Sequence, residues 1–197
     1  QQHRHRYSAA VLIGVATACS KTEDDSAERW RTANDAAFAA IKRDAAYTEI
    51  KSPGHEGSIY YKELKKGTGT KPILFTSAVS LYARGRFVAD YPDNKYIRQG
   101  TVFQSWQEAD GVPFTTLVSS VGKVPKDYRA HILTNGVRVA LQYMHEGDRW
   151  EVWVPYTLGL GEDEGSVFRS VMPSATATRI PAYSTLVFEI EVVGVHS

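Results

Sequence analysis

Apolar and polar residues alternate with a period of two in several segments of the chain, and this alternation predicts a β-sheet. The segments are residues 58–64, 76–83, 149–154 and 185–192. In the last of them Leu186, Phe188 and Ile190 share one face, while Glu189 and Glu191 point the other way. Such a pattern is typical of antiparallel strands that are covered on one side only.

A helical period replaces this alternation near the start of the chain. The apolar positions between about 26 and 45 recur at steps of three and four and predict an amphipathic helix, with Asp25 or Ser26 as its N-cap. These positions are Trp30, Ala33, Ala37 and Ile41. The loop-like composition of residues 51–57 then marks a boundary between this helix and the strands.

A second, shorter helix is predicted within residues 135–144. One face of it carries Val137, Ala140, Leu141 and Met144, and Gly147 follows as a stop signal. Because this helix stands alone between strands, we expect an α+β fold in which an antiparallel sheet wraps around it.

Residues 1–19 have the pattern of an export signal. Basic residues precede an apolar run over 9–18, which is about half as long as a bilayer span requires, and small residues then lead to Cys19. This order resembles a bacterial lipoprotein signal, in which the cysteine is lipidated. We therefore expect a lipid anchor at Cys19 and a place in the cell envelope, at the outer membrane on its periplasmic or surface side. The alternative is a free cysteine buried on an N-terminal helix.

Composition excludes several classes of protein. The 23 Lys and Arg residues nearly balance the 22 Asp and Glu residues, so charge gives no sign of nucleic-acid binding. Cys19 is the single cysteine, which rules out a disulfide framework and a multi-cysteine zinc site. The 6 histidines lack the spacing of a zinc hydrolase, so no metal is expected.

Several fragments occur in the order of a known protein family. They are Gly67-Thr68-Gly69, Thr101-Val102-Phe103, Pro113-Phe114, Glu146-Gly147-Asp148, Val154-Pro155-Tyr156, and the ending from Ile180-Pro181 to Val187-Phe188. Together they resemble FKBP-type peptidyl-prolyl cis-trans isomerases over roughly residues 58–195. The start of the chain is similar to exported FKBP-type lipoproteins of Bacteroidetes-like bacteria. The expected divisions are thus a signal segment over 1–19, a tether and helix over 20–57, and an FKBP-like domain over 58–197.

The resemblance implies a half-barrel sheet curled around the short helix, with a proline-binding pocket between them. The expected catalytic residues are Tyr82, Phe103, Phe114, Thr134 and Phe188, where Thr134 supplies a backbone N–H to a substrate carbonyl. The expected substrate-binding residues are Gln104, Leu133, Val137, Leu160 and Ile180. The family aspartate is replaced by Gln104, the floor tryptophan by Val137 and a tyrosine by Leu160, and these changes favour reduced activity. Loops over 86–101, 119–131 and 162–178 are expected to border the pocket.

Prolyl isomerisation requires neither a cofactor nor a metal. The barrier of about 18–20 kcal/mol is the amide resonance lost when the C–N bond twists, and an apolar cavity favours the twisted amide. The expected partners are proline-containing segments of exported proteins, the membrane through the lipid anchor, and an envelope complex. The competing hypothesis is a catalytically inactive FKBP-like binding subunit of an envelope or secretion assembly. Catalysis also requires that the protein's own side chains leave the pocket open.

Overall fold

The computed structural model describes residues 24–127, 129–173 and 179–196. Cys19 and the expected signal segment therefore lie outside the described residues. The strands are β1 (Thr48–Lys51), β2 (Ser58–Lys65), β3 (Ala78–Phe87), β4 (Val102–Trp106), β5 (Phe114–Leu117), β6 (Arg149–Val154) and β7 (Leu186–His196). The helices are α1 (Ser26–Lys42) and α2 (Asn135–Leu141), with short 3-10 turns at Glu108–Asp110, Val118–Ser120 and Tyr156–Leu158.

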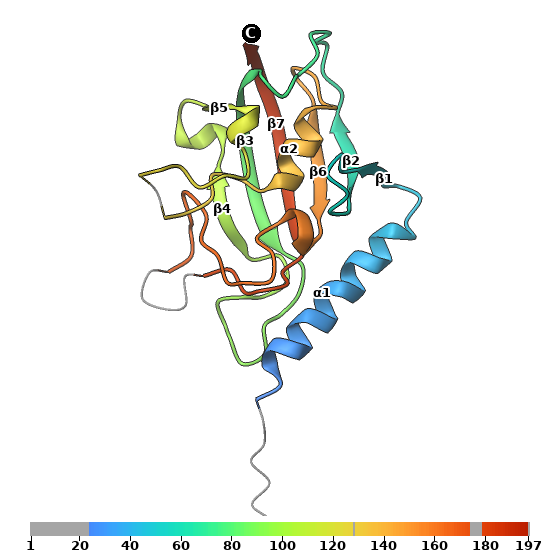
Figure 1. The fold of residues 1–197 in the computed structure, drawn as a ribbon, viewed down its shortest axis with the longest axis vertical. Coiled ribbons are helices and arrows are strands. Elements are labelled where there is room, and N and C mark those ends of the chain that lie inside the picture. The colour runs from blue at the N-terminus through green and yellow to red at the C-terminus, as the bar shows by residue number, and fades with distance from the viewer. Residues whose placement is uncertain (1–23, 128, 174–178, 197) are drawn as a thin grey trace, which may run out of the picture.

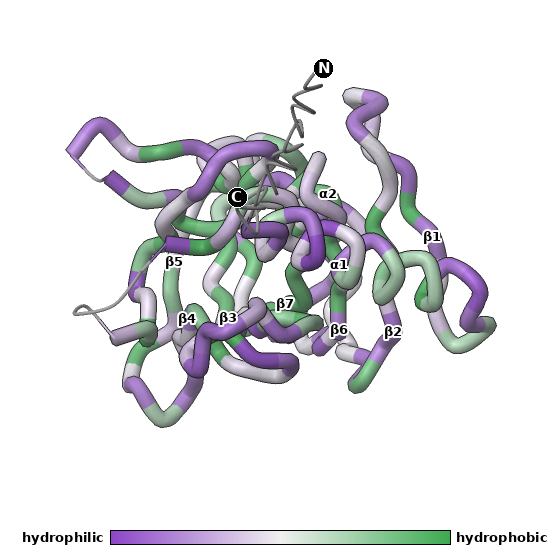
Figure 2. The backbone as a smooth tube through the Cα atoms, turned by 90° about the horizontal axis from the view of Figure 1, so that it is seen from below, coloured by the Kyte–Doolittle hydropathy of each residue, from purple (hydrophilic) through white to green (hydrophobic). Residues whose placement is uncertain are grey.

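All seven strands form one antiparallel sheet in the order β1-β2-β6-β7-β3-β4. Strand β5 pairs with the first half of β3, on the same edge on which β4 pairs with the second half. Helix α2 lies against one face of this sheet, and α1 runs outside it towards β1 (Figure 1). Figure 2 shows hydrophobic stretches along the central strands and hydrophilic stretches in the surrounding loops. The predicted strands and the short helix are confirmed, and the face of the sheet that carries α2 is called the inner face below.

The core forms where α2 meets the inner face. Val137, Ala140 and Leu141 are fully buried, as the helical period predicts. Gly136 allows this approach, because a Cβ atom there would lie 2.5 Å from Cγ1 of Val154 on β6. Close contact of helix and sheet excludes water from the central strands.

The N-terminal helix is confirmed over Ser26–Lys42, but it packs through a different stripe from the predicted one. The buried residues are Trp30, Asn34 and Phe38, whereas Ala33 is exposed. Asn34 is buried because its Oδ1 accepts the backbone N–H of Thr185 at 2.9 Å. The period of the helix was therefore predicted correctly, but a polar residue with a specific partner shifts the buried face.

Two loops also differ from expectation. Residues 52–57 connect β1 to β2 as a hairpin, so the sheet begins before the expected boundary at 58. The 86–101 loop packs on α1, where the rings of Tyr91 and Trp30 lie 5.4 Å apart. Within the described residues, no helix combines the length and apolar character needed to cross a bilayer.

Candidate functional site

A small apolar pocket lies on the inner face between the sheet and the segment that enters α2. It is lined by Leu81, Ala83, Gln104, Trp106, Phe114, Ile132, Leu133, Phe168 and Arg169, and is called the inner pocket below. Strands β3, β4 and β5 supply one wall, and residues 132–133 supply the other. Three expected site residues, Gln104, Phe114 and Leu133, therefore meet at one place.

Four other expected residues pack around this region as part of the core without lining the pocket. Phe103, Phe188, Val137 and Ile180 are almost completely buried, and none of them contributes to the pocket lining. The rings of Phe103 and Phe188 meet edge to face at 5.7 Å. Their contact takes place over Gly85, where a Cβ atom would lie 2.5 Å from Cζ of Phe103.

A β-bulge brings two consecutive residues of β4 into this interior. The register between β3 and β4 shifts after the pair Gly85–Gln104, because Arg86 pairs with Val102. One residue of β4 is thereby inserted, and both Phe103 and Gln104 are buried. Regular alternation would have placed one of the two on the outer face.

Tyr82 does not line the inner pocket, so its expected role as a pocket wall is wrong. Leu81 and Ala83 point inwards from β3, and Tyr82 between them points to the outer face because side chains alternate along a strand. Its hydroxyl donates a hydrogen bond to the carbonyl of Gly111 at 3.1 Å. Ala83 takes the place in which the tyrosine was expected.

Thr134 is the N-cap of α2 and follows two pocket residues, Ile132 and Leu133. Its carbonyl accepts the N–H of Val137 at 3.1 Å, which fixes the first turn of the helix. Its hydroxyl is buried without a hydrogen-bond partner among the described residues. The backbone of Thr134 therefore stands next to the pocket, as the proposed donor requires.

Six pocket residues were not among the expected site residues: Leu81, Ala83, Trp106, Ile132, Phe168 and Arg169. The ring of Trp106 lies 4.6 Å from that of Phe114 and 5.8 Å from that of Phe168. The guanidinium of Arg169 lies 4.3 Å from the centre of the Trp106 ring. Trp106 follows Gln104 by two positions, so the alternation of side chains along a strand predicts that both lie on the same face. Nothing local in the sequence identifies Phe168.

Residues 165–172, called the strap below, cross the mouth of the inner pocket. Leu160 supports the base of the strap rather than the pocket, since a Cβ on Gly165 would lie 2.9 Å from its Cδ1. Ile180 exchanges two backbone hydrogen bonds with Gly165, at 2.7 and 3.0 Å. With Phe168 inside, the pocket retains about 10 Å³. The inner pocket is therefore closed in this conformation, by the loop that was expected to border it.

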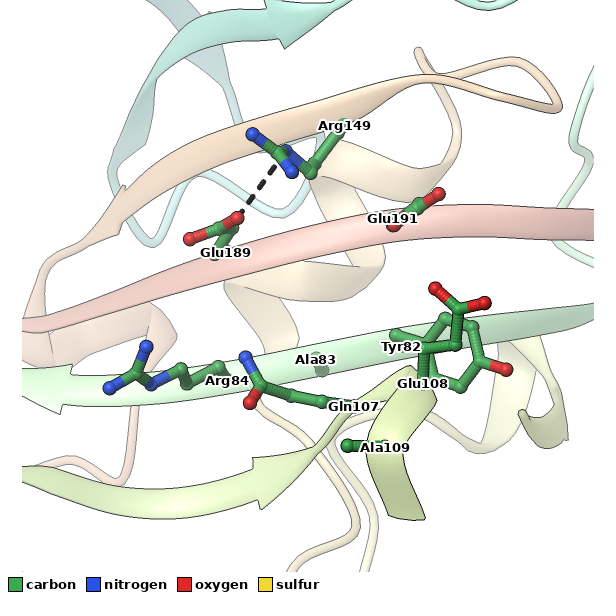
Figure 3. Close-up of a pocket in the computed structure, with 9 residues that line it drawn as sticks. All are labelled: Tyr82, Ala83, Arg84, Gln107, Glu108, Ala109, Arg149, Glu189 and Glu191. Atoms are coloured by element: carbon green, nitrogen blue, oxygen red, sulfur yellow. Dashed lines mark ion pairs between the residues drawn. The ribbon is translucent and has the colours of Figure 1, made fainter. Parts of the chain in front are cut away.

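A larger groove lies on the outer face, behind the inner pocket (Figure 3). Its volume is about 270 Å³, and its lining includes Arg84, Glu108, Glu189 and Glu191 beside Tyr82. Arg149 pairs with Glu189 at 3.3 Å across β6 and β7. So many charged side chains keep this groove hydrated, whereas the transition state of prolyl isomerisation is stabilised by an apolar surface. The inner pocket therefore remains the candidate site.

A second polar cluster on the outer face surrounds Glu151 of β6. Tyr47 and Trp153 donate hydrogen bonds to its Oε1 at 2.5 and 2.8 Å, and Arg86 lies 3.6 Å from its Oε2. Burial alone would raise the pKa of the Glu151 carboxyl, but these hydrogen bonds and the charges of Arg86 and Lys62 hold this pKa below its ordinary value. Burial and the same contact raise the pKa of Tyr47 to about 12.

Across the described part of the chain, no three His, Cys, Asp or Glu side chains are grouped so that they could hold a metal ion. The inner pocket in particular offers one buried amide and one guanidinium among apolar and aromatic side chains.

Comparison with known proteins places this geometry in a family. The profile of the FKBP-type peptidyl-prolyl cis-trans isomerases matches residues 84–193, more than half of the chain. The macrophage infectivity potentiator of Trypanosoma cruzi is 27% identical over 137 residues, which are 70% of this chain and 53% of that protein. The chain thus spans about half the length of this curated relative.

Solved structures agree with this match. A peptidyl-prolyl cis-trans isomerase from Pseudomonas syringae pv. tomato superimposes with a TM-score of 0.57 and 25% identity, over 86% of this chain and 96% of that one. FkpA from Escherichia coli gives 0.56 and 16% identity, over 87% and 63%, and its likeness concerns the fold alone. The predicted FKBP-like fold with an N-terminal helix is confirmed, and the chain belongs to the FKBP-type peptidyl-prolyl cis-trans isomerase family.

Proposed function

We propose that this protein catalyses the cis-trans isomerisation of X-Pro peptide bonds, and that it does so in the inner pocket. The observation that carries the proposal is that the family match covers Gln104, Phe114 and Leu133, which the fold brings together. Proline-containing segments of exported proteins are the proposed substrates, and assistance to their folding is the proposed role.

The apolar walls supply the main chemical effect. A twisted prolyl amide has lost its resonance and is less polar than the planar amide. It therefore loses less hydration free energy when water is removed. The rings of Phe114 and Trp106 offer such a surface. Lowering the barrier from exchange in tens of seconds to milliseconds requires about 5–6 kcal/mol. Binding the transition state better than the ground state is sufficient, because no covalent bond is made to the protein.

Backbone hydrogen bonding supplies orientation. We assign the backbone N–H of Thr134 to the substrate carbonyl, because the N-cap position fixes this peptide beside Leu133 at the pocket wall. One fixed hydrogen bond contributes about 1 kcal/mol and sets the direction in which the amide twists. Val137 and Leu160 do not line the inner pocket. We therefore propose that these two replacements reduce activity through neighbouring residues and not through contact with the substrate.

A protease-coupled assay on a proline-containing tetrapeptide tests this function. We expect faster cis-trans exchange in proportion to protein concentration. Activity should fall when the pocket is changed by Phe114→Ala and persist after Leu117→Ala, an exposed position on the same strand. A lack of acceleration by micromolar protein, both in the parent and after Phe168→Ala opens the pocket, would leave an FKBP-like binding subunit as the remaining explanation.

We further propose that the protein is exported and lipid-anchored through Cys19 at the outer membrane, like an FKBP-type lipoprotein of Bacteroidetes-like bacteria. The support is the order of basic, apolar and small residues before this cysteine. Two or more acyl chains are sufficient for stable attachment. Expressed with its signal segment, the protein should sediment with membranes, and Cys19→Ala should release it. Continued sedimentation of the variant would contradict lipidation.

A further inference from the structure

We propose that the strap closes the inner pocket against substrate, and that Gln104 is the positioning residue that holds it closed. This inference rests on the proposed function, because it concerns access to the same pocket. Substrate then binds only to the fraction of molecules in which the strap has moved away.

The strap is held by backbone hydrogen bonds along both of its edges. On one side, Phe168 donates its N–H to the carbonyl of His131 at 2.7 Å, and His131 donates to Ser166 at 2.9 Å. On the other side, Val171 donates to the carbonyl of Phe103 at 3.0 Å. The strap thus covers the free edge of β4 and bridges it to the segment before α2.

The side chain of Phe168 occupies the space that a prolyl ring needs. Its ring lies 5.8 Å from Trp106 and 6.2 Å from Phe114, which are the aromatic walls of the pocket. The remaining 10 Å³ is room for about one water molecule, whereas ligand pockets measure about 300 Å³ or more. Phe168 and a substrate proline therefore exclude each other.

Gln104 connects the strap to the wall of the pocket. Its Nε2 donates to the carbonyls of Ile132 and Phe168, each at 2.7 Å. A carboxylate in the same place could donate to neither carbonyl. The amide nitrogen therefore ties the two sides of the pocket mouth together.

The closed arrangement also contains two features that cost free energy. Gln104 is 4% exposed, and its Oε1 has no hydrogen-bond partner among the described residues, although it could accept one from water or a substrate N–H. Arg169 has a φ of 54°, which is unfavourable for a residue with a Cβ atom. Both features lower the stability of the closed arrangement, which depends on the hydrogen bonds of the strap and of Gln104.

Access to the pocket can be measured without reference to catalysis. Leu133 is buried and lines the pocket, so Leu133→Cys places a thiol inside it. With Cys19→Ser, this is the only thiol, and its rate of reaction with iodoacetamide reports opening. We expect Gln104→Glu and Phe168→Ala each to raise this rate by about tenfold, which corresponds to about 1.4 kcal/mol of lost closure. Val171→Ala, at an exposed position of the same strap, should leave it unchanged.

The isomerase assay on the same strap variants, with Leu133 intact, separates the two proposals. If the strap limits access, kcat/KM for the tetrapeptide should rise with Phe168→Ala, since the apparent affinity scales with the open fraction. Equal labelling rates in the parent, Gln104→Glu and Phe168→Ala, with circular dichroism showing folded protein, would overturn the strap proposal. Faster labelling without isomerase activity in any variant would uphold the strap and overturn the proposed function.

Discussion

The core layer beneath the inner pocket and the strap above it, called the floor and the roof below, are built from different kinds of contact. Beneath the pocket, Phe103 and Phe188 are completely buried, and their rings meet edge to face in the core. Above it, Phe168 and Arg169 reach in from the strap and remain partly open to solvent. Hydrophobic packing holds the floor, whereas a few hydrogen bonds and ring contacts hold the roof.

This difference separates stability from access. Removing atoms from a buried, close-packed region loses both transfer free energy and packing contacts, which lowers the free energy of unfolding of the whole domain. Removing a contact from the strap affects a segment that can open locally. Substitutions in the floor should therefore lower stability, and substitutions at the pocket wall or roof should mainly change activity or access.

The largest effect is expected for Phe188→Ala. The ring is fully buried and meets Phe103 edge to face, so its loss should lower the free energy of unfolding by about 3–5 kcal/mol. Urea denaturation followed by circular dichroism measures this loss, and isomerase activity should fall with it. A loss below about 1 kcal/mol would show that the floor is not a packed core.

The next effect in size is expected for Gly85→Ala. The added Cβ would lie 2.5 Å from Cζ of Phe103 and 2.9 Å from Cε1 of Phe188. Overpacking of this kind should cost about 1–3 kcal/mol in urea denaturation. Arg84→Ala, at the exposed neighbouring position, is the matched control and should be nearly neutral. An equal loss in both variants would remove the packing explanation.

Phe114→Ala tests the wall between floor and roof. Phe114 is half-buried on β5, so its removal should leave the fold intact while lowering kcat/KM by about tenfold, or about 1.4 kcal/mol of transition-state binding. The protease-coupled assay, with circular dichroism as a folding check, measures both. Unchanged activity in a folded variant would remove Phe114 from the site.

The smallest effect is expected on the outer face, behind the floor. Glu151→Gln should cost about 1 kcal/mol at pH 7, because the hydrogen bonds from Tyr47 and Trp153 lose their charged acceptor. The folded pKa of Glu151 lies below the ordinary 4.5, so its charged form stabilises the fold above about pH 4.5. That stabilisation disappears as the pH falls through the folded pKa.

Thermal unfolding at two pH values measures this dependence. The parent and Glu151→Gln should differ at pH 7, and the difference should shrink in acid. A difference that is the same at pH 7 and in acid would show that the charge of Glu151 makes no contribution.

The alternation of side chains along β3 explains both a correct and a wrong prediction of the site from the sequence. The alternation of Val79, Leu81 and Ala83 predicts the inner face of β3 correctly, and the same alternation excludes Tyr82 from it. The assignment of Tyr82 followed the family resemblance against this alternation. Phe114, Leu133 and Gln104 were found, because local motifs carry them to the pocket.

The amino-acid sequence alone determined the strand and helix periods, the wrapping of the sheet around α2 and the family, because these depend on local pattern and the order of motifs. The bulge that buries Phe103 beside Gln104, and the strap that places Phe168 in the pocket, were decided by tertiary structure. Both depend on pairing between segments far apart in the chain, where hydrogen bonds and free space are fixed only once the sheet has formed.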